Sequence, residues 1–265
     1  AELVAGAPGL AELDVSASGL GKGAGVMLWG AVLEQAAAAV AAGEGEEGLR
    51  TLRASGNQLA GEEVDAAALQ ALLEANPPLR ALELNGNKLN EAAAAALGAG
   101  LAENTVLQRL ELHSNWLCEP GARALSATLG ANTALHALNL RSNNLGPGGG
   151  RAVAEALRCN RALTALDLSF NNLGEEGGRA VAVALEGNPG LAALNLSSNK
   201  IVRGAAAALG RLLHRNAALT ALTLNHNLLG PAGAAAVAAG LARNGTLTAL
   251  GLAANRLGDG GAQPV

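Results

Sequence analysis

Residues 163–188 read LTALDLSFNNLGEEGGRAVAVALEGN, and this stretch decides the fold. Its first half follows the pattern L-x-x-L-x-L-x-x-N-x-L, in which Leu163, Leu166 and Leu168 precede Asn171. The alternation around the second and third leucines predicts a short strand with one buried face. The Ala- and Val-rich second half predicts a helix with one apolar stripe. Between them Asn171 turns the chain, and its amide can satisfy backbone groups that the strand leaves unpaired.

The same pattern recurs along the chain at a fixed interval. From Asn87 to Asn255 the asparagine of the turn returns every 28 residues, and Asn57 begins the series 30 residues before Asn87. A second asparagine column also steps by 28 residues, near the expected end of each helix. The two columns are Asn57, Asn87, Asn115, Asn143, Asn171, Asn199, Asn227 and Asn255, and Asn76, Asn104, Asn132, Asn160, Asn188, Asn216 and Asn244. They take 15 of the 22 asparagines, which indicates a structural requirement at both positions.

A helix after every strand predicts how the repeats assemble. Each repeat can bury its leucine face only against the next one, so the repeats stack along one axis. The predicted fold class is an α/β solenoid of 28-residue repeats, shaped as a horseshoe. Its parallel β-sheet lines the concave face and its α-helices cover the convex face. We further expect the second asparagine column to adopt the left-handed conformation that ends helices.

These motifs resemble leucine-rich repeats of the ribonuclease-inhibitor-like subfamily, in which a helix follows every strand. The repeat L-x-x-L-x-L-x-x-N-x-L-G-x-x-G-A-x-A-L-A-x-A-L-x-x-N is most similar to that of NOD-like receptors. Ribonuclease inhibitor itself alternates two repeat types, which this chain does not. The resemblance covers about residues 49–265. It specifies the fold but not the function, because the scaffold hosts inhibitors, immune sensors, actin-capping and ciliary proteins, and GTPase activators.

The chain is predicted to form one leucine-rich repeat domain over residues 1–265, with irregular ends. Its parts are an irregular N-terminal repeat with a lengthened helix (1–48), eight regular repeat strands (49–257) and a truncated last repeat (258–265). The lengthened helix is expected over residues 25–42. Its expected apolar contacts come from Met27, Trp29, Val32 and Leu33. Because solenoids need polar caps, we expect the chain to belong to a longer protein with further domains.

Composition narrows the protein class. Hydrophobic residues make up 50% of the chain and aromatic residues 1%, so Leu, Ala and Val must fill the core. No apolar run approaches the roughly 18 residues that would suggest a membrane span, and no signal peptide is visible. The 2 cysteines do not form a disulfide framework, which fits a reducing compartment. We therefore expect a cytoplasmic protein that does not bind membranes.

The candidate contact residues lie at strand positions that face the concave side. One column is mostly alanine, interrupted by Arg109, and the other columns vary most between residues 83 and 170. Trp116 and Phe170 lie beside the turn asparagine, and an exposed aromatic near arginine is typical of a binding hot spot. Two alternatives stay open: Trp116 covers a loop, and Phe170 folds back into the core. The predicted partner-binding residues are Glu83, Arg109, Glu111, His113, Trp116, Arg141, Asp167 and Phe170.

No catalytic or cofactor site is predicted. His113 and His226 lie four repeats apart, which is roughly 19 Å at about 4.8 Å per strand. Cys118 and Cys159 fall at opposite ends of their repeats, so neither a disulfide nor a metal site follows. The glycines of residues 19–23 lack the flanking pattern of a phosphate-binding loop. No basic stripe is interleaved with aromatic residues, which argues against nucleic acid. We predict no enzyme activity, no cofactor and no metal.

The predicted function is a non-catalytic module that binds a protein partner through its concave face. The resemblance to NOD-like receptors implies the ligand-sensing or autoinhibitory repeat domain of a larger receptor-type protein. One alternative is a GTPase-activating protein of the Ran-activator type, with Arg53 or Arg141 as the exposed arginine. The other is an architectural repeat protein of a ciliary or cytoskeletal complex. The partner itself is not specified.

Overall fold

A computed structural model describes residues 7, 9–21, 23–41, 48–59 and 63–258 of the chain. Within these residues nine strands alternate with eight helices, and the strands form one parallel sheet in sequence order. The strands are β1 (Glu12–Asp14), β2 (Thr51–Arg53), β3 (Ala81–Glu83), β4 (Arg109–Glu111), β5 (Ala137–Asn139), β6 (Ala165–Asp167), β7 (Ala193–Asn195), β8 (Ala221–Thr223) and β9 (Ala249–Gly251). The helices are α2 (Ala24–Ala41), α3 (Glu63–Glu74), α4 (Glu91–Glu103), α5 (Cys118–Leu129), α6 (Gly146–Cys159), α7 (Gly174–Leu185), α8 (Arg203–Arg215) and α9 (Gly230–Leu241).

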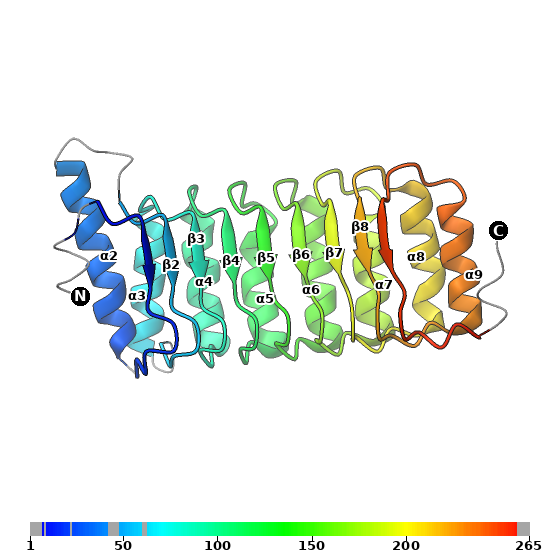
Figure 1. Ribbon diagram of the computed structural model, residues 1–265, viewed down its shortest axis with the longest axis horizontal. Coiled ribbons are helices and arrows are strands. Elements are labelled where there is room, and N and C mark those ends of the chain that lie inside the picture. Colours follow the sequence, from blue (N-terminus) through cyan, green and yellow to red (C-terminus); the bar gives the residue numbers. More distant parts are fainter. Residues whose placement is uncertain (1–6, 8, 22, 42–47, 60–62, 259–265) are drawn as a thin grey trace.

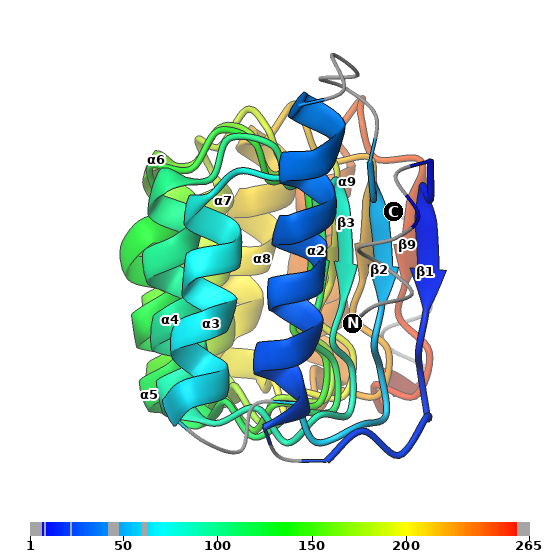
Figure 2. The same ribbon diagram turned by 90° about the vertical axis from the view of Figure 1, so that its left-hand side faces the viewer.

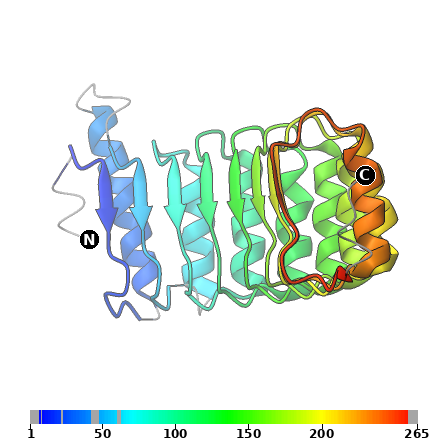
Figure 3. The ribbon, with the colours of Figure 1, turned by 45° about the vertical axis from the view of Figure 1, so that its right-hand side comes forward.

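The elements form two layers. Figure 1 shows the strands side by side in front of a row of helices, and the end-on view of Figure 2 separates the two layers. In the described chain β1 pairs only with β2 and β9 only with β8, so the sheet does not close. The turns that follow the strands lie in a row along one edge, the lower edge in Figure 3. The predicted α/β leucine-rich repeat solenoid is confirmed.

Register explains why such short strands build one core. Each strand has three residues, and the pairing aligns the middle leucines, as in Leu82 with Leu110 and Leu138 with Leu166. From β2 to β8 these middle leucines are at most 3% exposed, because they point toward the helices. The two flanking residues of each strand therefore face the concave side. The sheet holds a single apolar spine beneath a variable surface.

The first asparagine column forms a buried ladder along the turns. Asn115 donates from Nδ2 to the carbonyls of Leu84 (3.0 Å) and Leu112 (2.8 Å). Its Oδ1 accepts from the backbone N–H of Asn87 (2.8 Å) and Leu89 (3.0 Å), so one side chain joins two repeats. All eight members are buried. We call these eight residues the asparagine ladder, and the predicted role of their amides is confirmed.

The second asparagine column follows the prediction at Asn76, whose φ is +49°, but differs from it at later helix ends. Asn104, Asn160 and Asn216 are C-cap residues with extended backbone (φ −81°, −65° and −77°), not left-handed backbone. The physical reason lies in the side chain. Asn160 Nδ2 donates to the carbonyl of Leu129 in the preceding repeat (2.7 Å), and its Oδ1 accepts from Leu163 N–H (2.8 Å). The column therefore links repeats at the opposite edge from the ladder.

The N-terminal repeat is stabilised by different buried polar groups. Its lengthened helix is present as the 18-residue α2, in which Trp29 and Val32 are buried. Met27, however, is 65% exposed, so the expected apolar contact is wrong, because this end helix packs against a single neighbour, α3. Buried Asp65 of α3 accepts from Gly23 N–H (2.9 Å) and Val26 N–H (3.2 Å) at the start of α2. Residues 259–265 of the predicted truncated repeat lie outside the described residues.

Candidate protein-binding face

The sheet presents its flanking residues as straight columns across the concave side. The register aligns Arg53 with Glu83, Glu83 with Glu111, and Asn139 with Asp167. The predicted contact residues Glu83, Glu111 and Asp167 therefore belong to one row of side chains. The parallel row, from Ala81 to Ala221, is alanine except for Arg109. The concave face therefore combines a row of alanine methyl groups with a parallel row of polar side chains.

At the N-terminal end of the polar row, charges are paired across three strands. The Arg53 guanidinium lies 3.1 Å from a Glu12 carboxylate oxygen and 3.3 Å from one of Glu83. The hydrogen bond to Glu12 raises the pKa of Arg53. Next to it, Ser16 N–H donates to Asp14 (2.9 Å) and lowers the pKa of Asp14 below its ordinary value. These groups form a fixed, net acidic cluster.

In the middle of the row, amide side chains hold the carboxylates. Asn139 Nδ2 donates to Glu111 (2.7 Å), while Arg109 lies 2.8 Å from the other oxygen of that carboxylate. The Glu111 side chain is only 12% exposed, whereas Arg109 is 59% exposed. Asp167 accepts from Asn195 Nδ2 (3.0 Å) and from a backbone N–H. Arg109 and Asp167 are thus held in place by their neighbours before any partner arrives.

A shallow groove of about 280 Å³ runs across these strands. It extends from Arg109 and Glu111 on β4 to Thr223 on β8, with alanine and leucine residues of β5–β8 in its floor. At about 4.8 Å per strand, four intervals give a length of roughly 19 Å. Such a groove has room for an extended polypeptide segment. It brings Arg109, Glu111 and Asp167 together, while Glu83 lies outside its lining.

Trp116 and Phe170 lie at the edge of this face and are exposed. Trp116 is 62% exposed, with Lys88 Nζ 5.9 Å from its ring centre. Phe170 is 45% exposed, and the Arg141 guanidinium carbon lies 4.4 Å from its ring centre. Phe170 therefore does not fold back into the core. Lys88, the cation beside Trp116, was not among the predicted contact residues. Its position directly after Asn87, which matches that of Trp116 after Asn115, could have indicated it.

Backbone geometry makes Phe170 unusual. Its φ is +60°, in the left-handed region where a side chain on a non-glycine residue costs about 1 kcal/mol or more. At the same turn position, also with positive φ, other repeats have Ser114, Ser142, Ser198, His226 and Ala254. A bulky, half-exposed ring in this conformation is not explained by local backbone preference or by burial. An exposed phenylalanine is typical of a surface that binds another molecule.

The other residues considered in the sequence, His113, the two cysteines and Gly23, form few interactions that could bind a ligand. His113 Nδ1 lies 3.1 Å from Ser114 Oγ, and the backbone N–H of His113 donates to Asn85 Oδ1 (2.8 Å). In the described part of the chain, no group of three or more His, Cys, Asp or Glu residues could hold a metal ion. Cys118 and Cys159 are free thiols. The N–H of Gly23 is taken by Asp65, which leaves it unavailable to a phosphate.

Two repeats match the family model described as Leucine Rich repeat, at residues 131–154 and 159–182. The chain carries leucine-rich repeats. The leucine-rich repeat-containing protein LegL7 from Legionella pneumophila is 19% identical, with a TM-score of 0.54, and the match covers 91% of this chain and 82% of that one. Leiomodin-1 actin-binding site 2 is 24% identical over 56% of this chain and 86% of that chain, with a TM-score of 0.49. No curated protein sequence matches the chain.

The first of these structures supports the leucine-rich repeat fold alone. Ribonuclease-inhibitor-like and NOD-like subfamily membership stays a prediction from the repeat pattern. None of the described helices is both long and apolar enough to cross a membrane.

Proposed function

We propose that this leucine-rich repeat chain is a protein-binding module whose partner lies across the concave face of β3–β6 and the adjoining turns. The observation that carries the proposal is the pair of exposed aromatic residues, Trp116 and Phe170, in the turns that follow β4 and β6, two of the strands that line the groove. Aromatic and arginine side chains dominate binding energy at protein interfaces. Arg109, exposed and already oriented by Glu111, supplies a third anchor at the end of the groove.

The fixed positions of the carboxylates in the groove also support a protein-binding role. Glu111 and Asp167 are fixed by Asn139 and Asn195, so a partner does not have to order them. The groove is lined mainly by small apolar and amide side chains, which suit a polypeptide more than a charged small molecule. That the module serves a NOD-like receptor-type protein remains a prediction from the repeat sequence.

The two alternative functions rest on sequence alone. The GTPase-activator alternative needs an available arginine, and Arg53 is held between Glu12 and Glu83. Arg141 is exposed but lies over Phe170. Single-turnover GTP hydrolysis by small GTPases, with and without the chain, tests this alternative directly. The architectural alternative predicts partner binding that does not depend on the concave face.

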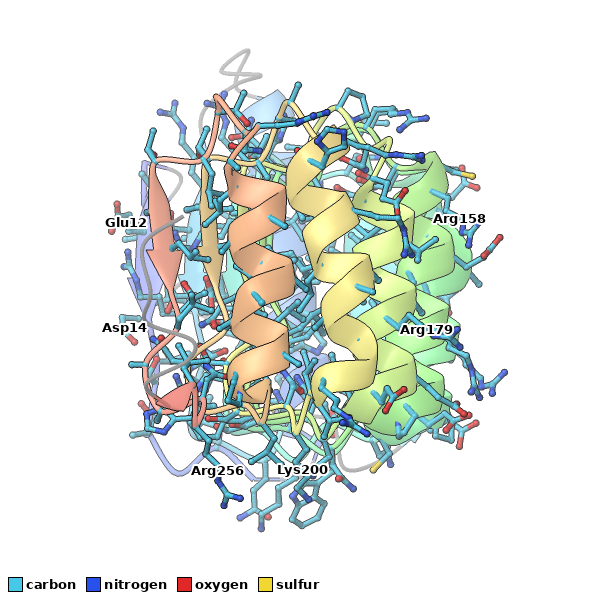
Figure 4. The ribbon with its side chains drawn as sticks, turned by 90° about the vertical axis from the view of Figure 1, so that its right-hand side faces the viewer. Glu12, Asp14, Arg158, Arg179, Lys200 and Arg256 are labelled. Atoms are coloured by element: carbon cyan, nitrogen blue, oxygen red, sulfur yellow. The ribbon has the colours of Figure 1, made fainter. Side chains whose placement is uncertain are left out.

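The test of the proposed function uses variants that copy neighbouring repeats. Arg109→Ala, Glu111→Asn and Asp167→Asn together give β4 and β6 the alanine and asparagine that β5 and β7 already carry. We expect the partner captured from native extract by the unchanged chain to be lost by this sheet variant. Arg158→Ser and Arg179→Ser, on exposed convex positions (Figure 4), form the matched control and should retain it. Equal capture by all three would move the site away from the concave face.

A further inference from the structure

The seven turns that follow β3–β9 share one charge property. They comprise residues 84–90, 112–117, 140–145, 168–173, 196–202, 224–229 and 252–257, and we call them the turn edge. All of these residues are described, and none is Asp or Glu. The turn edge contains the cations Lys88, Arg141, Lys200 and Arg256. Lys200 and Arg256 both protrude at this edge in Figure 4.

Cationic and apolar residues alternate along the turn edge. The first, third, fifth and seventh turns carry Lys88, Arg141, Lys200 and Arg256, and the second, fourth and sixth carry Trp116, Phe170 and Leu228. All seven side chains are exposed. Among the described residues only five large hydrophobic side chains are exposed, and three of them are these. The alternation has a period of two repeats, whereas the fold requires nothing beyond a period of one.

The adjoining sheet surface has the opposite sign. Its two flanking columns hold five carboxylates and two arginines, a net charge of −3: Glu12, Asp14, Glu83, Glu111 and Asp167 against Arg53 and Arg109. Both arginines are paired with carboxylates of the sheet. The turn-edge cations, in contrast, form no ion pair with any described residue. Two of them instead lie over aromatic rings.

We propose that the turn edge binds an extended acidic segment of the protein partner, with carboxylates on the cations and apolar side chains on Trp116, Phe170 and Leu228. The inference rests on the proposed function and names the chemistry of the partner. The turns that carry cations are two repeats apart, or about 10 Å, and an extended chain rises about 3.3 Å per residue. Lys88, Lys200 and Arg256 directly follow the ladder asparagine, and Arg141 lies two residues before it. The matching segment therefore carries Asp or Glu at every third position with apolar residues between them.

Charge and spacing favour a polypeptide over a nucleic acid at the turn edge. A phosphodiester backbone carries charge at every nucleotide and would also lie beside the net acidic sheet. A protein segment can place carboxylates only over the cations and keep neutral or basic groups over the sheet. Exposed aromatic residues with adjacent cations accept apolar side chains as well as charge.

The test uses a fluorescein-labelled peptide of four Glu-Leu-Gly units as the probe. We expect it to bind the intact chain, with an affinity that falls as salt rises. A cation variant, with Lys88→Asn, Arg141→Ser and Lys200→Asn, should bind about tenfold more weakly and lose most of the salt dependence. An aromatic variant, with Trp116→Asn and Phe170→Ser, should also weaken binding about tenfold but keep the salt dependence. These substitutions copy Asn144, Asn172, Ser169 and Ser198 of neighbouring turns, so the fold is preserved.

Two further peptides and one nucleic acid complete the test. A Gln-Leu-Gly peptide and a Glu-Gly-Gly peptide should each bind more weakly than the probe, and the convex variant with Arg158→Ser and Arg179→Ser should bind the probe like the intact chain. No binding of the probe at millimolar concentration, equal binding by the cation variant, or tighter binding of oligothymidylate would overturn the inference. If partner capture depends on Arg109 and Asp167 while the probe does not bind, the proposed function stands and the turn-edge inference is wrong.

Discussion

The asparagine ladder and the exposed residues of the turn edge are neighbours in the same turns, yet they have different roles. Asn171 is fully buried and bonded to backbone groups of two repeats, while its neighbour Phe170 is 45% exposed. Asn115 and Trp116 show the same contrast. One position of each turn holds the solenoid together, and the adjacent positions are free to vary. A repeat protein can therefore acquire a binding surface without weakening its core.

The largest expected effect comes from breaking the ladder. Asn171→Ala leaves the N–H of Asn143 without its side-chain partner in a buried turn and removes one of the two amide groups that donate to the carbonyl of Leu140. We expect a loss of about 3 kcal/mol in the free energy of unfolding, measured by denaturant titration. The control is Asn172→Gly, at an exposed left-handed residue (φ +55°), which should change stability by less than about 0.5 kcal/mol. Equal losses would contradict the contrast.

A smaller effect is expected in the N-terminal repeat, where Ser18 stands in place of the ladder asparagine. Asp65→Ala removes both hydrogen bonds to the start of α2, which should cost about 2 kcal/mol locally. Hydrogen exchange should be faster at α2 amides and unchanged at α7, because stability in a solenoid is transmitted between neighbours. Asp65→Asn, which keeps an acceptor, should lie between. Unchanged exchange in α2 would show that this carboxylate does not anchor the end helix.

On the turn edge the expected change in stability is smaller still. Phe170→Ser places at this position the residue that Ser142 and Ser198 show at the same φ of +55°. The ring is 45% exposed and serine adopts the same left-handed backbone, so little buried contact is lost and the free energy of unfolding should change by less than about 1 kcal/mol. Denaturant titration of Phe170→Ser and of Asn171→Ala under the same conditions measures the two changes in the free energy of unfolding. A loss as large as that of the ladder variant would assign Phe170 to the core.

The last prediction concerns fluorescence and requires no change in stability. Trp29 is 1% exposed and Trp116 is 62% exposed, and these are the two tryptophans of the chain. Acrylamide should quench one accessible and one protected population. Trp116→Asn should remove the accessible population and leave blue-shifted emission from Trp29. A single, uniformly quenched population would contradict the placement of one of the two side chains.

The sequence predicts the architecture far better than the surface. Leucine and asparagine at 28-residue spacing require a parallel sheet and a buried ladder, because every repeat must satisfy the same backbone groups. The extended backbone of Asn160 could not be predicted, since the hydrogen bonds that set it reach into the preceding repeat. Met27 was wrongly expected to supply an apolar contact because only the structure shows that α2 has one neighbour. Lys88 was missed because its contact with Trp116 joins residues 28 positions apart.

The pairing of charged side chains across the sheet could not be predicted from the sequence either. The eight predicted contact residues lie on the concave side or at its edge, but their charges are already partly matched. Glu111 is held by Arg109 and Asn139, and Glu83 by Arg53, so each is less available than its column position indicates. Which carboxylate pairs with which cation depends on rotamers across strands. The alternation along the turn edge becomes visible only when the repeats are stacked.

The measurement that tests the central claim most directly is acrylamide quenching of Trp116 in the presence of the captured partner. If the partner covers the concave face and the turn edge, the accessible population should become protected as the complex forms, while Trp29 emission stays unchanged. The convex variant with Arg158→Ser and Arg179→Ser should show the same protection. A complex that forms with Trp116 quenched as readily as in the free chain would contradict the account.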